Sequence, residues 1–228
     1  TAGTINASGR NLVTVKIAGF ENVNKIDLSK NALTKVTLSN VGHVGELCLN
    51  DNKLASLDIN GVLITKLILS ANNFKTLDLT LIRAKWISLN KNDITSLTCS
   101  EINEDINYLH MPLESGRGGR LTSVEFAANL PNLRSLDIAN NNVSNISPLI
   151  ALQNITELYL GGNPALRNAQ QMNLLNGASF LPRLTRLNIG DSNQTATALQ
   201  IVKKSVNLKW LQIYNIGASA QQITGVIS

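Results

Sequence analysis

The chain has 228 residues, of which 43% are hydrophobic and only 4% aromatic, so it can bury a continuous core built mainly from aliphatic side chains. No run of about 18 apolar residues is present, which argues against a membrane-spanning helix. The formal net charge is +5, but the basic residues are spread along the chain and are not interleaved with stacking aromatics. Nucleic acid is therefore disfavoured as a partner.

An apolar residue, two variable positions and then Leu-x-Leu or its Ile/Val equivalent recur ten times along the chain. The strand centres that this pattern predicts begin at Ile5, Ile26, Leu47, Leu67, Ile87, Leu109, Leu136, Leu158, Leu187 and Leu211. Alternate side chains of a strand face opposite sides, so both apolar members of each Leu-x-Leu should point into the protein. A period of 20 to 29 residues predicts a solenoid with a parallel concave β-sheet of about ten strands.

An asparagine follows the first strand apolar residue by five positions in six of the repeats. These residues are Asn31, Asn52, Asn72, Asn92, Asn141 and Asn163. A turn at this corner leaves backbone N–H and C=O groups facing the interior, and a buried carboxamide can satisfy both kinds of group. We therefore predict that the six side chains form a structural ladder that joins consecutive repeats.

The backs of the repeats differ between the two halves of the chain. Up to residue 110, apolar triplets such as Leu33–Val36–Leu38 predict a second short strand on the convex side of each repeat. In residues 111–228, helical spacing predicts convex helices. This spacing is carried by Ala165, Leu166, Ala169, Met172 and Leu175, and again by Leu199, Val202 and Val206. The expected architecture is a single α/β solenoid domain over residues 1–228, strand-backed in 1–110 and partly helix-backed in 111–228.

Two stretches carry a family resemblance. Residues 133–160, LRSLDIANNNVSNISPLIALQNITELYL, closely resemble the leucine-rich repeats of bacterial internalin-type surface proteins. Residues 26–105 resemble a second bacterial class of leucine-rich repeat, which has two Leu-x-Leu strands. The resemblance implies a non-catalytic protein-binding module at the bacterial cell surface or in the extracellular medium, although repeats specify a scaffold better than a ligand.

The repeat register already includes Ile5, which leaves little room for the polar cap that a solenoid end needs. We therefore expect the chain to be a fragment of a longer protein. Either residues such as a signal peptide and a preceding segment have been removed, or a neighbouring segment covers this end.

No arrangement of residues suggests catalysis. His43 and His110 lie three repeats apart, and neither has a cysteine or carboxylate partner at metal-site spacing. Cys48 is expected on the outward side of its strand, exposed or half-exposed, whereas Cys99 is expected to be a small buried hydrophobe. These faces would be too far apart for a disulfide. We predict no enzyme activity, no cofactor and no metal site.

The outward positions of the predicted concave strands include every tryptophan and tyrosine of the chain, whereas the four phenylalanines fall elsewhere. Large amphipathic rings on a solvent-facing sheet are typical of protein-binding surfaces, because they supply contact area at low entropic cost. We predict one partner-binding cluster of Trp86, Tyr108 and His110. A second, looser cluster consists of Tyr159, Trp210 and Tyr214.

The insertion Glu-Ser-Gly-Arg-Gly-Gly-Arg at 114–120 places Arg117 and Arg120 in a glycine-rich segment, which is a candidate contact loop. A surface insertion without a role is an equal alternative. Two other functions stay open. The chain could select substrates for a secreted effector or enzyme whose catalytic part lies elsewhere, or it could bind a glycan, because tryptophan and tyrosine also stack on sugar rings.

Overall fold

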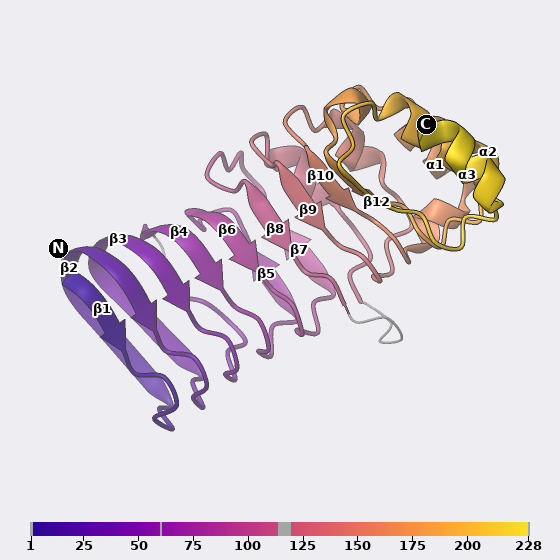
Figure 1. Ribbon diagram of the computed structural model, residues 1–228. Helices are drawn as coiled ribbons and strands as arrows, with labels where there is room; N and C mark the ends of the chain where they lie inside the picture. The colour runs from indigo at the N-terminus through magenta and orange to yellow at the C-terminus, as the bar shows by residue number, and fades with distance from the viewer. Residues whose placement is uncertain (1, 60, 114–119, 228) are drawn as a thin grey trace. The chain divides into compact units, whose positions relative to one another are not determined.

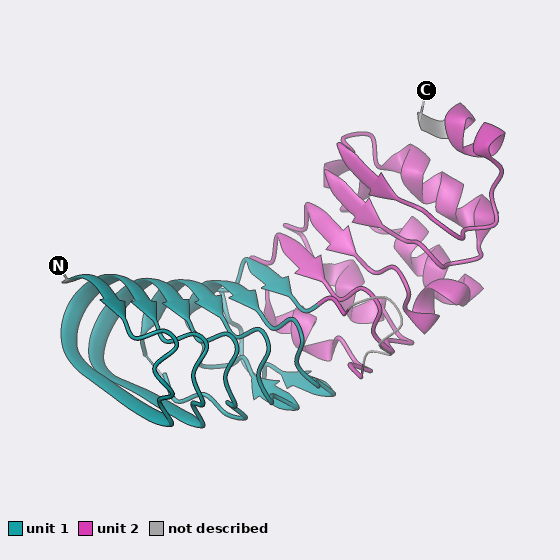
Figure 2. Ribbon diagram, turned by 60° about the horizontal axis from the view of Figure 1, so that its bottom comes forward, with its two compact units in different colours: residues 1–111 teal, residues 112–228 magenta. Residues whose placement is uncertain are grey.

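The structure is a computed structural model that describes residues 2–59, 61–113 and 120–227. The chain divides into two compact units, Thr1–Met111 (unit 1) and Pro112–Ser228 (unit 2), shown in Figure 2. In each unit, successive coils contribute one strand each to a row of parallel strands (Figure 1). These strands are called the concave strands. All ten predicted strands are present, six in unit 1 and four in unit 2, which confirms the α/β solenoid.

The concave strands of unit 1 pair in parallel in chain order. They are β1 (Ala2–Asn6), β2 (Thr14–Asp27), β3 (Lys35–Cys48), β4 (Leu63–Ile68), β6 (Ala84–Ser88) and β8 (Tyr108–His110). The register stacks the first apolar residue of each repeat on its equivalents, for example Ile26 on Leu47 and Leu67 on Ile87. These four side chains are fully buried. The period of the sequence thus becomes a continuous aliphatic layer.

The convex side of unit 1 differs from the expected row of separate short strands. In the first complete repeats, convex and concave segments belong to the single 14-residue strands β2 and β3. Their close pairing requires glycine, because a Cβ on Gly42 or Gly45 would collide with a backbone oxygen of β2. Later, β5 (Thr76–Asp78) pairs with β7 (Ser96–Thr98). The repeat that precedes β5 contributes only an isolated bridge, Thr37 to Asp58.

Unit 2 backs its strands with helices, as the spacing predicted. Its concave strands are β9 (Ser135–Asp137), β10 (Glu157–Tyr159), β11 (Arg186–Asn188) and β12 (Trp210–Gln212). The 3-10 helices are η1 (Glu125–Asn129), η2 (Ser147–Ala151), η3 (Pro164–Arg167) and η4 (Leu181–Arg183), and the α-helices are α1 (Ala169–Asn176), α2 (Thr195–Lys204) and α3 (Ala220–Ile227). Met172, Leu175 and Val202 are buried. Val206 departs from the prediction, since it lies beyond the end of α2 and is 74% exposed.

The corner asparagines make equivalent hydrogen bonds from repeat to repeat. Asn72 donates its amide to the carbonyls of Leu49 and Leu69, at 2.9 and 3.0 Å, and accepts from the N–H of Leu54 at 2.9 Å. Asn31, Asn52, Asn92 and Asn163 bridge neighbouring repeats in the same way, and Asn141 bonds to Ile138 O and Leu121 N. Each side chain satisfies backbone groups of two repeats at an inward-facing corner.

One buried asparagine lies on the convex side, and the asparagine ladder stops before the last two repeats. Asn103, which the sequence pattern did not reveal, is buried and donates to the carbonyls of Leu79 and Ile82 at 2.6 and 2.9 Å. In the last two repeats, Ser192 and Ile216 occupy the ladder position. Ser192 is fully buried, and its hydroxyl has no hydrogen-bond partner among the described residues. The final corners are therefore built differently from the preceding ones.

Candidate binding surfaces on the concave strands

In unit 1, six outward side chains form a row that we call the unit 1 strip: Lys25, Glu46, Lys66, Trp86, Tyr108 and His110. The first five occupy one register row across β2, β3, β4, β6 and β8, and His110 lies two residues beyond Tyr108 on the same face. Because side chains of a strand alternate, residues flanking a buried apolar position must point outward. The strand register then brings residues that are about 20 positions apart in sequence side by side.

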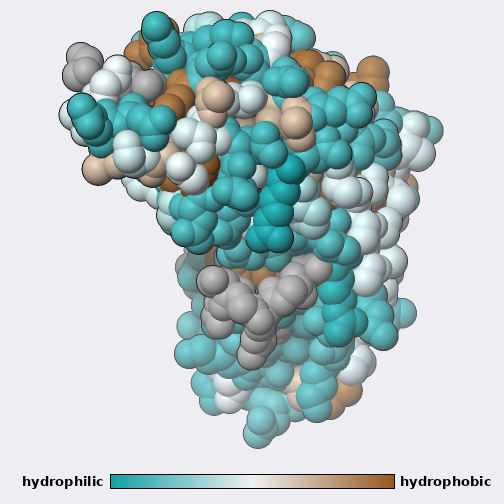
Figure 3. Space-filling model, turned by 90° about the vertical axis from the view of Figure 1, so that its right-hand side faces the viewer, coloured by the Kyte–Doolittle hydropathy of each residue, from teal (hydrophilic) through white to brown (hydrophobic). Residues whose placement is uncertain are grey.

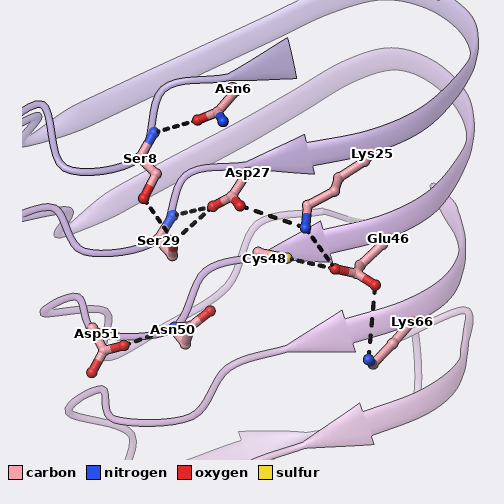
Figure 4. A network of polar contacts seen from close by, with 10 residues as sticks. All are labelled: Asn6, Ser8, Lys25, Asp27, Ser29, Glu46, Cys48, Asn50, Asp51 and Lys66. Carbon is pink, nitrogen blue, oxygen red and sulfur yellow. Dashed lines mark hydrogen bonds and ion pairs between the residues drawn. The ribbon is translucent and has the colours of Figure 1, made fainter. Parts of the chain in front are cut away.

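The basic and acidic members of the strip are paired (Figure 4). Lys25 Nζ lies 3.0 Å from Glu46 Oε1 and 3.6 Å from Asp27 Oδ2, and Lys66 Nζ lies 3.7 Å from Glu46 Oε2. A hydrogen bond from the Cys48 thiol, followed by the bond from Lys25, holds the pKa of Glu46 below its usual value. The bond to Glu46 raises the pKa of Lys25. These charges are thus neutralised locally.

The charged residues of the strip are in contact with its aromatic residues. Lys66 Nζ lies 5.0 Å from the centroid of the Trp86 ring, within the range of a cation–π contact. The Trp86 and His110 ring centroids are 5.6 Å apart in an edge-to-face arrangement at 72°. Tyr108 is the register partner of Trp86 and is half-buried. The indole of Trp86 is therefore held by neighbours from two other strands.

The structure corrects the expectation that Cys48 is exposed or half-exposed. Its side chain faces outward, but the residue is only 5% exposed, because it lies between Asp27 and Ile68 in the register and donates its thiol to Glu46 Oε1 at 3.0 Å. Burial, reinforced by this hydrogen bond, raises its pKa to about 12. Cys99 is buried as expected, and no disulfide joins the two cysteines. Cys48 is therefore an unreactive thiol at neutral pH.

In unit 2, Tyr159, Trp210 and Tyr214 form what we call the unit 2 cluster. The rings of Tyr159 and Trp210 lie 5.4 Å apart at 54°, although β11 runs between their strands. Tyr214 packs on Gly190, where any Cβ would overlap its ring. Trp210 and Tyr214 are each 39% exposed, whereas Tyr159 is half-buried. The structure thus pairs two of these rings and places the third against the backbone farther along the same face.

Polar groups surround the unit 2 cluster. Arg186 Nε lies 3.7 Å from Glu157 Oε1, and Ser135 Oγ donates to Glu157 Oε2 at 3.0 Å. Asp137 is the register partner of Tyr159. Burial raises the pKa of Asp137 to about 6, although its carboxylate accepts the N–H of Ala139 at 3.1 Å. Burial also raises the pKa of Tyr159. The carboxylate of Asp137 is therefore desolvated, unlike Glu46 in unit 1.

Of the two arginines of the predicted contact loop, only one lies among the described residues. Arg117 falls outside the described residues, and Arg120 is exposed. His43 bonds through Nε2 to Thr65 Oγ1 at 3.1 Å. The contact of Lys66 with Trp86 was not among the sequence-based predictions. The signal was available, because Lys66 and Trp86 hold equivalent positions in consecutive repeats.

Parallel strands with buried Leu-x-Leu pairs and asparagine-filled corners are the features of the leucine-rich repeat fold. Residues 131–171 match the family model for leucine-rich repeats in two copies. In the described part of the chain, no helix has the length and apolarity needed to cross a membrane. Nor do three or more His, Cys, Asp or Glu side chains come together there in a way that could hold a metal ion.

Two solved structures were found to be similar to this chain. A leucine-rich repeat protein of Leptospira interrogans is 19% identical, with a TM-score of 0.53, over 90% of this chain and 61% of that protein. The chain thus spans about three fifths of the Leptospira protein, and at this identity the likeness shows the fold alone. An internalin of Listeria monocytogenes is 17% identical, with a TM-score of 0.37, over 77% of this chain and 68% of that one. No curated protein matches the sequence.

Proposed function

We propose that the protein is a non-catalytic protein-binding module that recognises its partner through the concave strands. Solenoids of this class typically present an extended surface for binding other molecules. The observation that carries the proposal is the arrangement of Trp86, whose ring is outward-facing yet held between Lys66 and His110. An aromatic side chain already held in one orientation loses little entropy when a partner covers it, which is the property of a binding anchor.

The surroundings of the anchors support the same proposal. In unit 1 the paired charges of Lys25, Glu46 and Lys66 provide a polar margin beside the rings, as at the rim of a protein interface. On the side of the molecule seen in Figure 3, hydrophobic residues form small separate patches among hydrophilic ones. That side therefore offers no broad apolar surface as a rival docking site.

The cellular location is also a proposal. Residues 133–160 resemble internalin-type repeats, which supports display on a bacterial surface or secretion. Fractionation of the source cells, followed by immunoblotting of washed cells and culture medium, tests it. The proposal would be contradicted if the protein were found only in the cell lysate and survived protease treatment of the intact cells.

Affinity capture with the folded protein tests the proposed surface. The bait is compared with two double variants, Trp86→Ala/Tyr108→Ala and Tyr159→Ala/Trp210→Ala. Ile102→Ala is the matched control, because Ile102 is 70% exposed but lies outside the concave strands. At least one double variant should lose about 2 kcal/mol or more of binding to a captured protein, while its stability stays within about 1 kcal/mol per substitution.

Two results would contradict the proposal. One is equal affinity of the parent and both double variants for every captured protein. The other is unfolding of the Trp86→Ala single variant to the extent expected of an inward Leu89→Ala, since the ring would then belong to the core. An effector's substrate-recognition domain would use the same surface, and only a catalytic domain elsewhere in the full-length protein would distinguish that role.

A further inference from the structure

Unit 2 contains a polar cavity outside the aromatic cluster. Its volume is about 580 Å³, and it is lined by Arg167, Asp191, Asn193, Gln194, Asn215 and Gly217. The lining residues come from the corners that follow β10, β11 and β12. The cavity therefore opens beside the ends of the strands that carry the aromatic cluster.

The cavity forms where the asparagine ladder ends. Corners with a ladder asparagine have one left-handed residue before it. The last two corners, like the first one, each have a pair instead: Asp191 and Asn193, with φ of 61° and 50°, and Asn215 and Gly217, with φ of 53° and 80°. A Cβ on Gly217 would lie 2.8 Å from Thr195 Oγ1 and 3.3 Å from Asn193 Oδ1. Glycine at position 217 therefore keeps this space open.

Hydrogen bonds hold the lining groups in place. Arg167 Nε donates to the carbonyl of Asp191 at 3.3 Å, and Gln194 Nε2 donates to the carbonyl of Arg167 at 3.0 Å. Asn215 Nδ2 donates to Asp191 Oδ1 at 2.8 Å. A guanidinium carries five N–H donors and each carboxamide both donates and accepts. Hydrogen bonds thus orient the planar groups of Arg167, Gln194 and Asn215 before any ligand arrives.

An aromatic ring borders this polar set. Tyr214 directly precedes Asn215 in the chain, packs on Gly190 and is 39% exposed. Burial, followed by the nearby charge of Asp191, raises the pKa of Tyr214. The phenol ring therefore lies close to the carboxylate that lines the cavity, and an apolar ring surface and a hydrogen-bonding pocket adjoin.

The charges of the cavity select among ligand classes. Among the described residues that line it, Arg167 and Asp191 carry opposite charges and the others are neutral, so the lining has no net charge. The carboxylate of Asp191 disfavours an anion such as phosphate, and the guanidinium of Arg167 disfavours a cation. A hydroxyl group suits both, because it can donate to the carboxylate while accepting from the guanidinium. A ligand rich in neutral hydroxyls, with an apolar face for the ring, has the complementary chemistry.

We propose that this cavity binds a neutral saccharide, with the lining side chains bonding to its hydroxyls and Tyr214 stacking on one sugar ring. The site shares Tyr214 with the unit 2 cluster, but its hydrogen-bonding residues lie outside that cluster, and its ligand does not depend on the protein partner proposed above. Its lining residues were not among those singled out by the sequence, because only the stacking of consecutive corners brings residues 167, 191 and 215 together.

Titration of the whole chain with short neutral oligosaccharides tests the proposal. The probes are built from glucose, mannose, galactose or N-acetylglucosamine, and binding is measured by saturation-transfer NMR and calorimetry up to about 10 mM, above the roughly millimolar Kd expected of an open polar site. Arg167→Gln, Asn193→Gly and Tyr214→Ala should each weaken binding about tenfold or more. Glycine suits position 193, because it removes the carboxamide and tolerates the positive φ.

Two controls show whether a sugar binds in this cavity and through these groups. Trp86→Ala in unit 1 should leave saccharide binding unchanged, and inorganic phosphate should not bind the parent in the same concentration range. Asp191→Asn keeps the shape but leaves the cavity cationic, so it should weaken the sugar and admit phosphate. The proposal is overturned if no oligosaccharide binds, if binding survives the Arg167 and Asn193 substitutions unchanged, if Trp86→Ala abolishes it, or if the parent binds phosphate.

Discussion

The two units differ in the secondary structure that packs behind their concave strands. They also differ in the surroundings of their outward residues. In unit 1 the convex side is formed by strands and extended segments, and its outward row is an ion-paired series that leads to Trp86. In unit 2 the back is helical, and two rings meet across an intervening strand. Equivalent positions in the repeat therefore acquire different chemistry from their neighbours in adjacent repeats.

Two outward carboxylates illustrate this difference. Glu46 in unit 1 has a lowered pKa because it accepts hydrogen bonds from Cys48 and Lys25. Asp137 in unit 2 has a raised pKa because burial outweighs its bond to the backbone of Ala139. Both residues flank a buried leucine of a concave strand, so strand geometry alone cannot explain the opposite shifts. The surrounding side chains decide them, and for Glu46 these are Cys48 of the same strand and Lys25 of the neighbouring one.

The largest loss of stability should come from substitutions in the aliphatic core of each unit. Leu89 and Leu158 are inward residues of units 1 and 2, exposed by 1% and 0%. Leu89→Ala and Leu158→Ala should each destabilise the protein by about 2–5 kcal/mol, because a cavity remains where the side chain packed. Urea unfolding followed by circular dichroism measures both. A loss below about 1 kcal/mol in either variant would show that the residue does not belong to the core.

The asparagine ladder should matter equally in the two units. Asn72→Ala and Asn163→Ala should each cost about 1–3 kcal/mol, because both substitutions leave buried backbone groups of two repeats without partners. Asn50→Ala is the matched control, since its carboxamide donates to Asp51 at the surface, and should cost less than about 0.5 kcal/mol. Equal shifts of the urea midpoint for Asn50→Ala and Asn72→Ala would contradict the role of the ladder.

A smaller effect, opposite in sign between the units, should come from the two carboxylates. The pKa of Asp137 is about 6 in the folded protein, against an ordinary value of 3.8 for an aspartate. The folded state therefore binds the proton more tightly, so ionisation costs stability. This cost is absent below about pH 4 and complete above about pH 6. Asp137→Asn should raise stability at pH 7 by at most about 3 kcal/mol and have little effect near pH 4.

Glu46→Gln is the counterpart in unit 1. Its lowered pKa means that the ionised form stabilises the fold at pH 7, a contribution that is lost as the pH falls through the folded pKa. The substitution should therefore destabilise the protein at pH 7, by no more than about 1 kcal/mol because its ion pairs are partly exposed. Urea midpoints at both pH values test the pair. Stabilisation by Glu46→Gln, or destabilisation by Asp137→Asn, would remove the contrast between the units.

The repeat architecture could be predicted from the amino-acid sequence. The positions of the ten strands follow from alternation around Leu-x-Leu, and the helical back of unit 2 follows from the spacing of residues such as Met172 and Leu175. These signals are local, because each depends only on residues within one repeat. The outward placement of Trp86 and Trp210 follows from the same alternation, so the candidate surfaces could be located before the structure was known.

Contacts between residues of different repeats could not be predicted in this way, because they depend on how the repeats stack. Cys48 faces outward as the alternation requires, yet its neighbours on β2 and β4 bury it. Tyr159 reaches Trp210 across β11, and the cavity appears only when the corners holding Asp191 and Asn215 stack. A repeat pattern specifies which way each side chain points. Burial, ion pairing and cavities depend instead on the shapes of side chains 20 to 30 residues away, because stacking places them within contact distance.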